Sequence, residues 1–455
     1  MAKTKDVNML HGPILGSIIA YTVPIILTNV LQLCFNTADL IVVGRFCGSL
    51  SVAAVGATSS LVHLIINLFI GLSIGCGIAA AQSIGASDKA RTQRIVHTAV
   101  PVSAIIGIFL SIVGFFASGF MLKLMGTPAD VLPLSDLYLK IYFIGILGTM
   151  VYNFCAAILR AAGDTKSPLT FLTISGVVNV ILNLIFVILF DMDIAGVALA
   201  TTISQYLSAI LSVVALIKRE DSCKLYLSKV KVYKKELFEF MRIGIPAGIQ
   251  SSMFSFSNVI LQSSVNSLGA VVVSGSAASL NIENFVYTTM NAFHQTVLNF
   301  TGQNIGIKNY KRARKVFKIC LVCGIVTGLF LGMICLLFGK QLLGIYITDS
   351  AEAINVGFMR LSIMCISFAI AGSLEITTGA IRGMGISFQP MIITILGVCG
   401  IRILWVFTIF QIPAFHTVKM LYSVYPISWF STFVAEIITY YIVINKLQKK
   451  ATQKE

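Results

Sequence analysis

Long apolar runs separated by short polar stretches dominate the chain. Twelve runs are about 20 residues or longer, the length at which a helix crosses a hydrocarbon core about 30 Å thick. Their approximate limits are 14–43, 52–80, 95–120, 136–159, 167–190, 194–217, 237–264, 270–302, 316–346, 355–380, 388–410 and 421–445. Barrel strands would instead be about 10 residues of alternating pattern. The pattern therefore predicts an all-α polytopic membrane protein with twelve transmembrane helices.

Charged residues are few, and the basic ones are unevenly distributed. Of the 455 residues, 57% are hydrophobic and 11% are charged, against about 25% charged in a soluble domain. With twelve spans, both termini share one side with the basic stretches 89–94, 160–166, 229–236, 308–315 and 446–455, whereas the opposite loops are poor in Lys and Arg. The positive-inside rule then predicts a multi-pass protein of the cell (inner) membrane with both termini cytoplasmic. Because topology explains the net charge of +15, we expect no nucleic-acid partner.

Three stretches recur at a nearly constant offset. QSIGASDKARTQRIV (82–96) returns as QNIGIKNYKRARKVF (303–317), AILRAAGDTKSP (157–168) returns as GAIRGMGISFQP (379–390), and Pro24 returns as Pro246. Each half then contains six helices. Because six is even, both halves have the same orientation in the membrane, which defines a parallel internal repeat.

The repeat predicts the domain organisation. We expect an N-terminal lobe at 1–217, a basic cytoplasmic linker at 218–236 and a C-terminal lobe at 237–455. Bundles of two such lobes usually alternate a central cavity between the two sides of the membrane. This organisation favours a transporter.

One face of the first predicted span is polar. Asn29, Gln32, Asn36 and Asp39 follow helical spacing and share one face. A polar face turned to lipid would cost several kcal/mol, so it should face protein or a water-filled cavity. Asp39 could instead pair with Arg45 near the interface, but six residues correspond to about 240° around a helix, so the two side chains leave different faces. An ionisable group inside a span is a functional hypothesis by default.

The second half of the chain carries its own acids within spans. Glu375 lies seven residues before Arg382 on the same face, about 10 Å along the helix axis. It is either a water-bridged partner of Arg382 or a cavity-facing proton or substrate anchor. Glu283 shares its span with a polar face formed by Asn284, Thr288, Asn291, Gln295 and Asn299, beside which His294 is expected to pack or to form a hydrogen bond. The candidate substrate or proton residues of this lobe are Glu375, Glu283, Asn258 and Gln295.

Enzyme chemistry is not indicated. The sequence contains no Walker A loop and no catalytic constellation on adjacent predicted helices. Cys320 and Cys323 form a C-x-x-C without a second pair, which is typical of small packing residues in an apolar run. We therefore expect a protein that is not an enzyme and that needs no cofactor.

The sequence resembles the multidrug and toxic compound extrusion (MATE) transporters over essentially its full length. The matching stretches are VPIILTNVLQLCFNTADLIVVGRF in the first span, 157–183, 194–204, GQNIG at 302–306, and AIRGMG with the following Pro390. The resemblance implies a secondary active antiporter that exports organic, often cationic, compounds in exchange for protons or sodium ions by alternating access. Its implied partners are a small organic substrate and the lipid bilayer, and we expect a functional monomer.

The resemblance also implies roles for individual residues. A bend in the first helix is expected at Pro24. A cation or proton site, with sodium as one alternative, is expected at Asp39, Asn179, Asn183 and Thr201, to which the polar face of the first span adds Asn36. Some branches of the family carry acids in the C-terminal lobe, but the matching positions in this chain are Phe254 and Ala371. A cation site of that type is therefore not expected in this chain.

A flippase for lipid-linked oligosaccharides is the alternative function, because it resembles the same superfamily architecture. Such a protein should line its cavity with several cationic residues that bind a diphosphate. Lys and Arg are scarce inside the predicted spans, and Arg402 is the clearest candidate. The exporter is therefore favoured, while the substrate and the coupling ion stay open.

Overall fold

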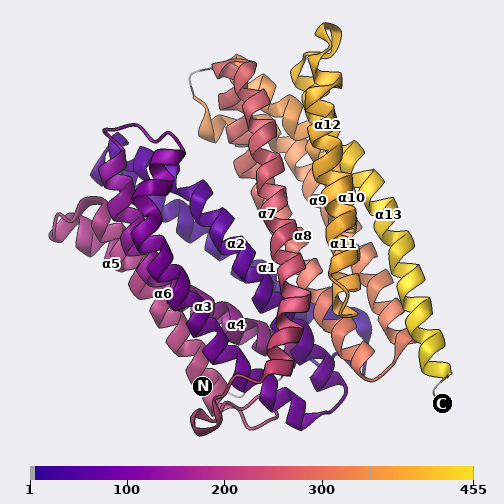
Figure 1. Cartoon of the computed structure of the whole chain (residues 1–455). Coiled ribbons are helices and arrows are strands. Elements are labelled where there is room, and N and C mark those ends of the chain that lie inside the picture. Colours follow the sequence, from indigo (N-terminus) through magenta and orange to yellow (C-terminus); the bar gives the residue numbers. More distant parts are fainter. Residues whose placement is uncertain (1–5, 349, 454–455) are drawn as a thin grey trace. The chain divides into compact units, whose positions relative to one another are not determined.

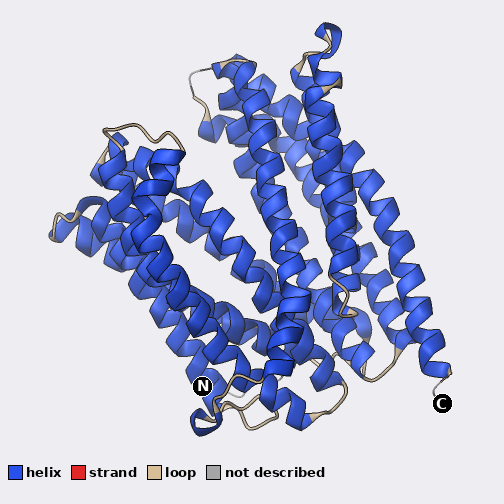
Figure 2. Cartoon of the chain, in the orientation of Figure 1, coloured by secondary structure: helices blue, strands red, loops and turns tan. Residues whose placement is uncertain are grey.

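The computed structural model describes residues 6–348 and 350–453. Within these ranges the chain forms helices and loops and contains no strand (Figure 2). The helices, labelled in Figure 1, are α1 (Ile14–Val42), α2 (Ser49–Gly85), α3 (Lys89–Leu124), α4 (Leu132–Ala162), α5 (Lys166–Leu184), α6 (Asp193–Lys218), α7 (Lys234–Ser267), α8 (Ala270–Gly306), α9 (Tyr310–Tyr346), α10 (Ala351–Gly383), α11 (Phe388–Thr394), α12 (Ile401–Phe407) and α13 (Val418–Thr452). Turns of π-helix extend α1 (Val43–Cys47) and α5 (Ile185–Leu189) and join α11 to α12 (Ile395–Gly400). The described chain therefore forms twelve helical rods, one of which combines α11 and α12.

Ten of the described helical segments are long and apolar enough to cross a membrane. Helices α7 and α8 contain 34 and 37 residues, so they are long enough to cross a membrane, but they carry more polar positions than those ten segments. The prediction of an all-α, multi-span membrane fold is confirmed, and the twelve rods are consistent with the twelve predicted spans. Several helices extend beyond the apolar runs because their ends are polar and capped. The run predicted at 95–120 is the middle of α3, whose first turn is capped by Asp88.

The internal repeat is visible in the backbone of the helix connections. Between α2 and α3, Ser87 adopts a φ of 55°, and Asp88 accepts a hydrogen bond from the backbone N–H three positions on. At 221 positions later, between α8 and α9, Lys308 adopts a φ of 58° and Asn309 forms the same cap. A positive φ is uncommon for residues other than glycine. Its recurrence supports a duplicated connection and not merely a similar helix length.

The chain divides into two compact units. The first unit contains the described residues of Met1–Asn8 and Val23–Gly248, and the second contains those of Met9–Thr22 and Ile249–Glu455. Helices α1 and α7 therefore each contribute to both units, and the division falls within two residues of Pro24 and Pro246. The predicted linker and the start of α7 lie in the first unit. The division into lobes at 217 and 237 stays a prediction from the repeat.

Helices α2 and α7 approach closely within the first unit through glycines. Gly71 and Gly75 of α2 face Gly244 and Gly248 of α7, and both pairs have the G-x-x-x-G spacing that permits close helix packing in membranes. A Cβ atom added at Gly71 would lie 2.4 Å from the carbonyl oxygen of Gly244. The absence of side chains at these positions therefore allows the two backbones to meet.

Candidate functional site

Asp39 of α1 is bound by side chains from α5. The Asn183 amide nitrogen donates to Asp39 Oδ1 at 2.5 Å and lies 3.4 Å from Asn179 Oδ1. Asn179 in turn donates to the hydroxyl of Thr201 on α6 at 3.3 Å. We call these four residues the Asp39 cluster. The structure thus brings together the four residues that the family resemblance implied.

Local packing explains why α5 reaches Asp39. Asn179 and Asn183 are four residues apart, so both face the same side of α5, and both are buried. One turn earlier, Gly176 lies against the ring of Phe35, and a Cβ atom added there would be 2.0 Å from that ring. Because glycine lacks this atom, α5 packs against α1 one turn before Asp39. The two amides are therefore held beside the carboxylate.

The Asp39 cluster offers oxygen atoms of the kind that bind hard cations. The side-chain oxygen of Asn183 is fully buried and has no hydrogen-bond partner. Carboxylate, amide and hydroxyl oxygens are the usual ligands of hard cations. The described residues contain no group of three or more His, Cys, Asp or Glu that could bind a metal. A cation at this site would therefore depend on one carboxylate and neutral oxygens, and a proton would need Asp39 alone.

Further polar groups surround the Asp39 cluster. Tyr138 and Tyr142 of α4 stack with ring centroids 6.1 Å apart, and both hydroxyls lie within electrostatic range of Asp39. Asn36, one turn before Asp39, is exposed and lies outside the hydrogen-bonded chain of the cluster. On the polar face of the first span, Asp39 is therefore half-buried in the cluster, whereas Gln32 and Asn36 are exposed.

The second unit uses Glu283 in a buried ion pair. Arg360 of α10 donates to its two carboxylate oxygens at 2.7 and 2.9 Å, and Ser279 donates to one of them at 2.8 Å. The guanidinium also lies 4.8 Å from the ring centroid of Tyr422. The sequence singled out Glu283 as an acid inside a span but did not identify Arg360, although an arginine in an apolar run is a signal that could have identified it.

Glu375 pairs with neighbours on α8. His294 Nδ1 lies 3.2 Å from one carboxylate oxygen, and the Tyr287 hydroxyl donates to the other at 3.1 Å. Arg382 instead donates to Gln250 at 2.7 Å. Tyr287 is 41% exposed, so this acid lies near the surface of its unit. His294 forms a hydrogen bond, as predicted, whereas the sequence pattern did not identify Tyr287.

The remaining candidates lie apart from Glu375. Gln295 donates to Asn291 on its own helix at 3.0 Å. Asn258 accepts a hydrogen bond at 3.2 Å from Arg402, which is 1% exposed and lies 4.2 Å from the ring centroid of Tyr425. In the described part of the chain no carboxylate pairs with Arg402, and its Nη2 atom has no hydrogen-bond partner. The four C-terminal candidates therefore belong to four separate sets of hydrogen bonds.

Glu436 of α13 is a further buried acid of the second unit. Thr378 and Thr394 donate to its two oxygens at 2.5 and 3.0 Å. Gln250 donates to Thr394 at 3.0 Å and accepts from Arg382. A hydrogen-bonded chain thus links this acid to Arg382.

Comparison with known proteins gives a consistent result. The family model described as MatE matches residues 24–185 and again residues 246–408, so each match begins at one of the two repeated prolines. The probable multidrug resistance protein YpnP of Bacillus subtilis (strain 168) is 28% identical over 398 residues, which cover 88% of this chain and 89% of that protein. The multidrug export protein MepA of a Staphylococcus saprophyticus strain is 22% identical and covers 85% of each chain. A solved MATE structure in complex with MaL6 shares the fold, with a TM-score of 0.91, 21% identity, and coverage of 98% of this chain and 100% of that one.

Proposed function

This chain belongs to the MatE family of membrane transporters and is not an enzyme, and on that premise we propose that it is a multidrug exporter. It exports organic, often cationic, drugs or toxic compounds in exchange for protons or sodium ions. The names of its relatives, a multidrug resistance protein and a multidrug export protein, support the substrate class. It acts as a monomer in the cell membrane and needs no cofactor.

The observation that carries this proposal is the carboxylate of Asp39 bound by an amide inside a membrane helix. A buried charge needs donors or a counter-ion, and the Asn183 amide supplies one donor. Binding of a proton or of Na⁺ removes the net charge of the carboxylate. Ion binding therefore changes how strongly α1 is attached to α5, which is the property that a coupling site needs.

Pro24 connects this change to the rest of α1. Proline has no N–H, so one backbone hydrogen bond of the helix is missing at this point and bending is easier. The two compact units divide two residues before Pro24. We therefore assign to Pro24 the bend through which the segment carrying Asp39 moves relative to the start of α1.

Protons and sodium ions place different demands on the Asp39 cluster. A proton needs only one carboxylate oxygen, and it would turn Asp39 into a hydrogen-bond donor. Sodium would use Asp39 for charge, with Asn179, Asn183 and Thr201 as neutral oxygens, and the unpaired oxygen of Asn183 fits this arrangement. Both ions remain candidates under the proposal.

The acids of the second unit take different roles. Arg360 binds both oxygens of Glu283, so we assign this acid to holding α8 and α10 together. Glu375 has a neutral hydroxyl and an ionisable imidazole as neighbours and lies near an exposed tyrosine. Glu375 is therefore the better candidate for a second proton site or substrate anchor. Asn258 and Gln295 serve as hydrogen-bond partners of their neighbours.

One observation favours the alternative of a flippase for lipid-linked oligosaccharides. Arg402 is a buried cation without a carboxylate partner among the described residues, and a diphosphate would satisfy its unpaired nitrogen. A single such residue falls short of the several cations that a diphosphate would require. The exporter therefore remains the main proposal.

The proposal is tested by dye transport in everted vesicles that contain the full-length chain, in which export from the cytoplasmic side is measured as entry of the dye into the vesicle. Vesicles are energised by a proton gradient or by a sodium gradient, and export of a cationic dye is compared with that of an anionic dye. Asp39→Asn keeps the shape of the side chain and removes its charge. We expect this variant to lose gradient-driven efflux of the cationic dye, while the wild type responds to at least one gradient.

Asp136→Asn is the matched control. Asp136 of α4 already pairs with Lys140 at 2.6 Å, so it has a fixed counter-ion and should not couple ion movement to drug export. This variant should retain efflux. Full activity of Asp39→Asn under both gradients would contradict the coupling role. Transport of the anionic dye alone, lost on Arg402→Gln, would favour the alternative function.

A further inference from the structure

A cavity of about 360 Å³ lies in the second unit, where the N-terminal segment meets the start of α9. Its walls are formed by Leu10, His11, Gly12, Ile14, Asn309, Lys311, Arg312 and Lys315. Three of these side chains are cations, and none of the lining residues is an acid. The cavity therefore has a strongly positive lining.

Arg312 builds the wall of this cavity. Its guanidinium donates to the backbone carbonyls of Met9, His11 and Gly12, each at 3.2 Å. Carbonyl groups satisfy the N–H donors but carry no net charge. Arg312 therefore holds the N-terminal segment in place, and within the described ranges no carboxylate offsets its positive charge.

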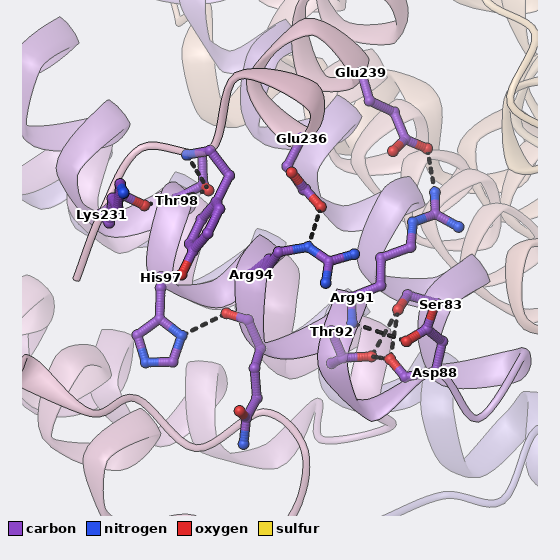
Figure 3. Close-up of polar contacts among 12 residues, drawn as sticks. Ser83, Asp88, Arg91, Thr92, Arg94, His97, Thr98, Lys231, Glu236 and Glu239 are labelled. Atoms are coloured by element: carbon purple, nitrogen blue, oxygen red, sulfur yellow. Dashed lines mark hydrogen bonds and ion pairs between the residues drawn. The ribbon is translucent and has the colours of Figure 1, made fainter. Parts of the chain in front are cut away.

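The other half of the repeat shows how these positions are neutralised elsewhere. Arg91 and Arg94 lie 221 positions before Arg312 and Lys315. Figure 3 shows that Arg91 reaches Glu239, at 2.6 Å, and that Arg94 reaches Glu236, at 2.7 Å. Two glutamates at the start of α7 thus neutralise the first pair of cations. Among the described residues no carboxylate pairs with Lys311, Arg312 or Lys315.

The face of α9 that carries the two lysines continues as an apolar surface. Lys311, Lys315, Val322, Val326 and Leu329 lie within about 60° of one another around the helix axis. All five are exposed, and the last three are 60%, 60% and 53% exposed. A lipid with its headgroup beside the lysines could lay its acyl chains along this surface.

We propose that this cavity binds the phosphate group of an anionic ligand, with an acidic phospholipid as the favoured occupant. Lys311 and Lys315 supply the charge, and Arg312 shapes the wall. The positive-inside rule predicts that this end of α9 lies on the cytoplasmic side, where anionic lipids attract basic segments. The site is separate from the Asp39 cluster and does not depend on the transport proposal.

The test is thermal unfolding of the full-length chain in detergent with three added probes: phosphatidylglycerol, phosphatidylcholine and inorganic phosphate. A ligand that binds the folded state raises the Tm in a concentration-dependent way. We expect phosphatidylglycerol to raise the Tm and phosphatidylcholine to have little effect. Each lysine beside an anionic headgroup increases the binding affinity about fivefold, so Lys311→Ala/Lys315→Ala should raise the half-maximal phosphatidylglycerol concentration about 25-fold.

Two further variants make the result specific. Lys311→Arg/Lys315→Arg keeps both charges and should retain the response. Lys446→Ala/Lys450→Ala removes two exposed charges from α13 of the same unit, outside the cavity, and should also retain it. An equal response to inorganic phosphate, lost in the double alanine variant, would support the site with a soluble phosphate as its occupant. An unchanged phosphatidylglycerol response in the double alanine variant, or an equal loss in the α13 variant, would overturn the proposal.

Discussion

Arg219, just after α6, shows how single residues stabilise a membrane protein outside its spans. Its guanidinium donates to Asp221 at 2.5 Å and to Asp6 at 2.5 Å, and lies 3.7 Å from Asp164. Burial raises the pKa of the Asp221 carboxyl, but the hydrogen bonds and charge of Arg219 outweigh burial and lower that pKa below its usual 3.8. This acid is therefore more easily ionised in the folded chain than in the unfolded one.

The lowered pKa of Asp221 predicts the pH dependence of stability. A carboxyl of this kind stabilises the fold above its unfolded pKa, and the contribution is lost as pH falls through the folded pKa. Asp221→Asn should lower the free energy of unfolding at neutral pH by less than about 1 kcal/mol, because the side chain is partly exposed and screened. The variant should also lose less stability than the wild type when the pH falls below about 4. Thermal unfolding at several pH values measures both effects.

Asp191→Asn is the matched control for this prediction. Asp191 is exposed in the loop between α5 and α6. No salt bridge to Asp191 is found among the described residues, so its replacement should not reproduce the change expected of Asp221→Asn. A profile of Asp221→Asn that parallels the wild type under acid would show that the contact with Arg219 does not contribute to stability.

At the scale of helices, the close approach of α2 and α7 depends on glycine. A Cβ at Gly71 meets backbone atoms of Gly244 and Gly248 at 2.4 to 2.8 Å, and backbone atoms cannot move aside as a flexible side chain can. We predict that Gly71→Ala destabilises the protein by about 1–3 kcal/mol, the usual effect of overpacking. A lower Tm of the purified full-length chain in detergent is the expected measurement.

Gly56 provides the control on the same helix. A Cβ added there meets no atom within 4 Å. Gly56→Ala should keep or raise the Tm, because alanine favours helix by up to about 1 kcal/mol over glycine. Equal Tm values for the two variants would contradict the packing argument.

At the scale of the whole molecule, the prediction concerns topology. Both termini should lie in the cytoplasm, because with twelve spans they share one side of the membrane with the loops that carry the basic stretches. A fluorescent protein that folds only in the cytoplasm, fused after Glu455, should therefore fluoresce. The same reporter fused after Asp191, in the loop between α5 and α6, should stay dark.

A periplasmic enzyme reporter at the same two positions should give the reverse pattern. The two reporters then control each other, since poor expression of a fusion would lower both signals. Exchanged signals, with the reporter after Asp191 fluorescent and the one after Glu455 dark, would show that the assigned orientation is wrong, and equal signals from the two positions would show that the number of spans between them is wrong.

The sequence by itself determined the features that depend on local pattern. Runs of apolar residues that are long enough to cross the membrane as a helix predicted the helical, multi-span fold. This was possible because hydropathy and helix length are properties of each segment. Recurring motifs predicted the duplication, and the φ values of Ser87 and Lys308 agree with it. Periodicity placed Asp39 on a polar face. The family resemblance, and not the periodicity, supplied its partners on α5 and α6.

The tertiary structure alone decided which side chains meet across helices. Glu283 pairs with Arg360, which lies 77 residues away in the sequence. Helical spacing does not connect two residues so far apart. Glu375 meets His294 and Tyr287 instead of Arg382, because the neighbouring helix α8 supplies closer partners than the next turns of its own helix. The positive cavity at Lys311 and Lys315 is also a product of the tertiary structure. The basic residues of α3 recur in α9 at an offset of 221, but the acids that neutralise those of α3 have no counterpart beside α9 among the described residues. The charge and the spacing of residues can be read from the sequence. Whether a basic side chain is neutralised by an acid depends on which segments the fold places side by side.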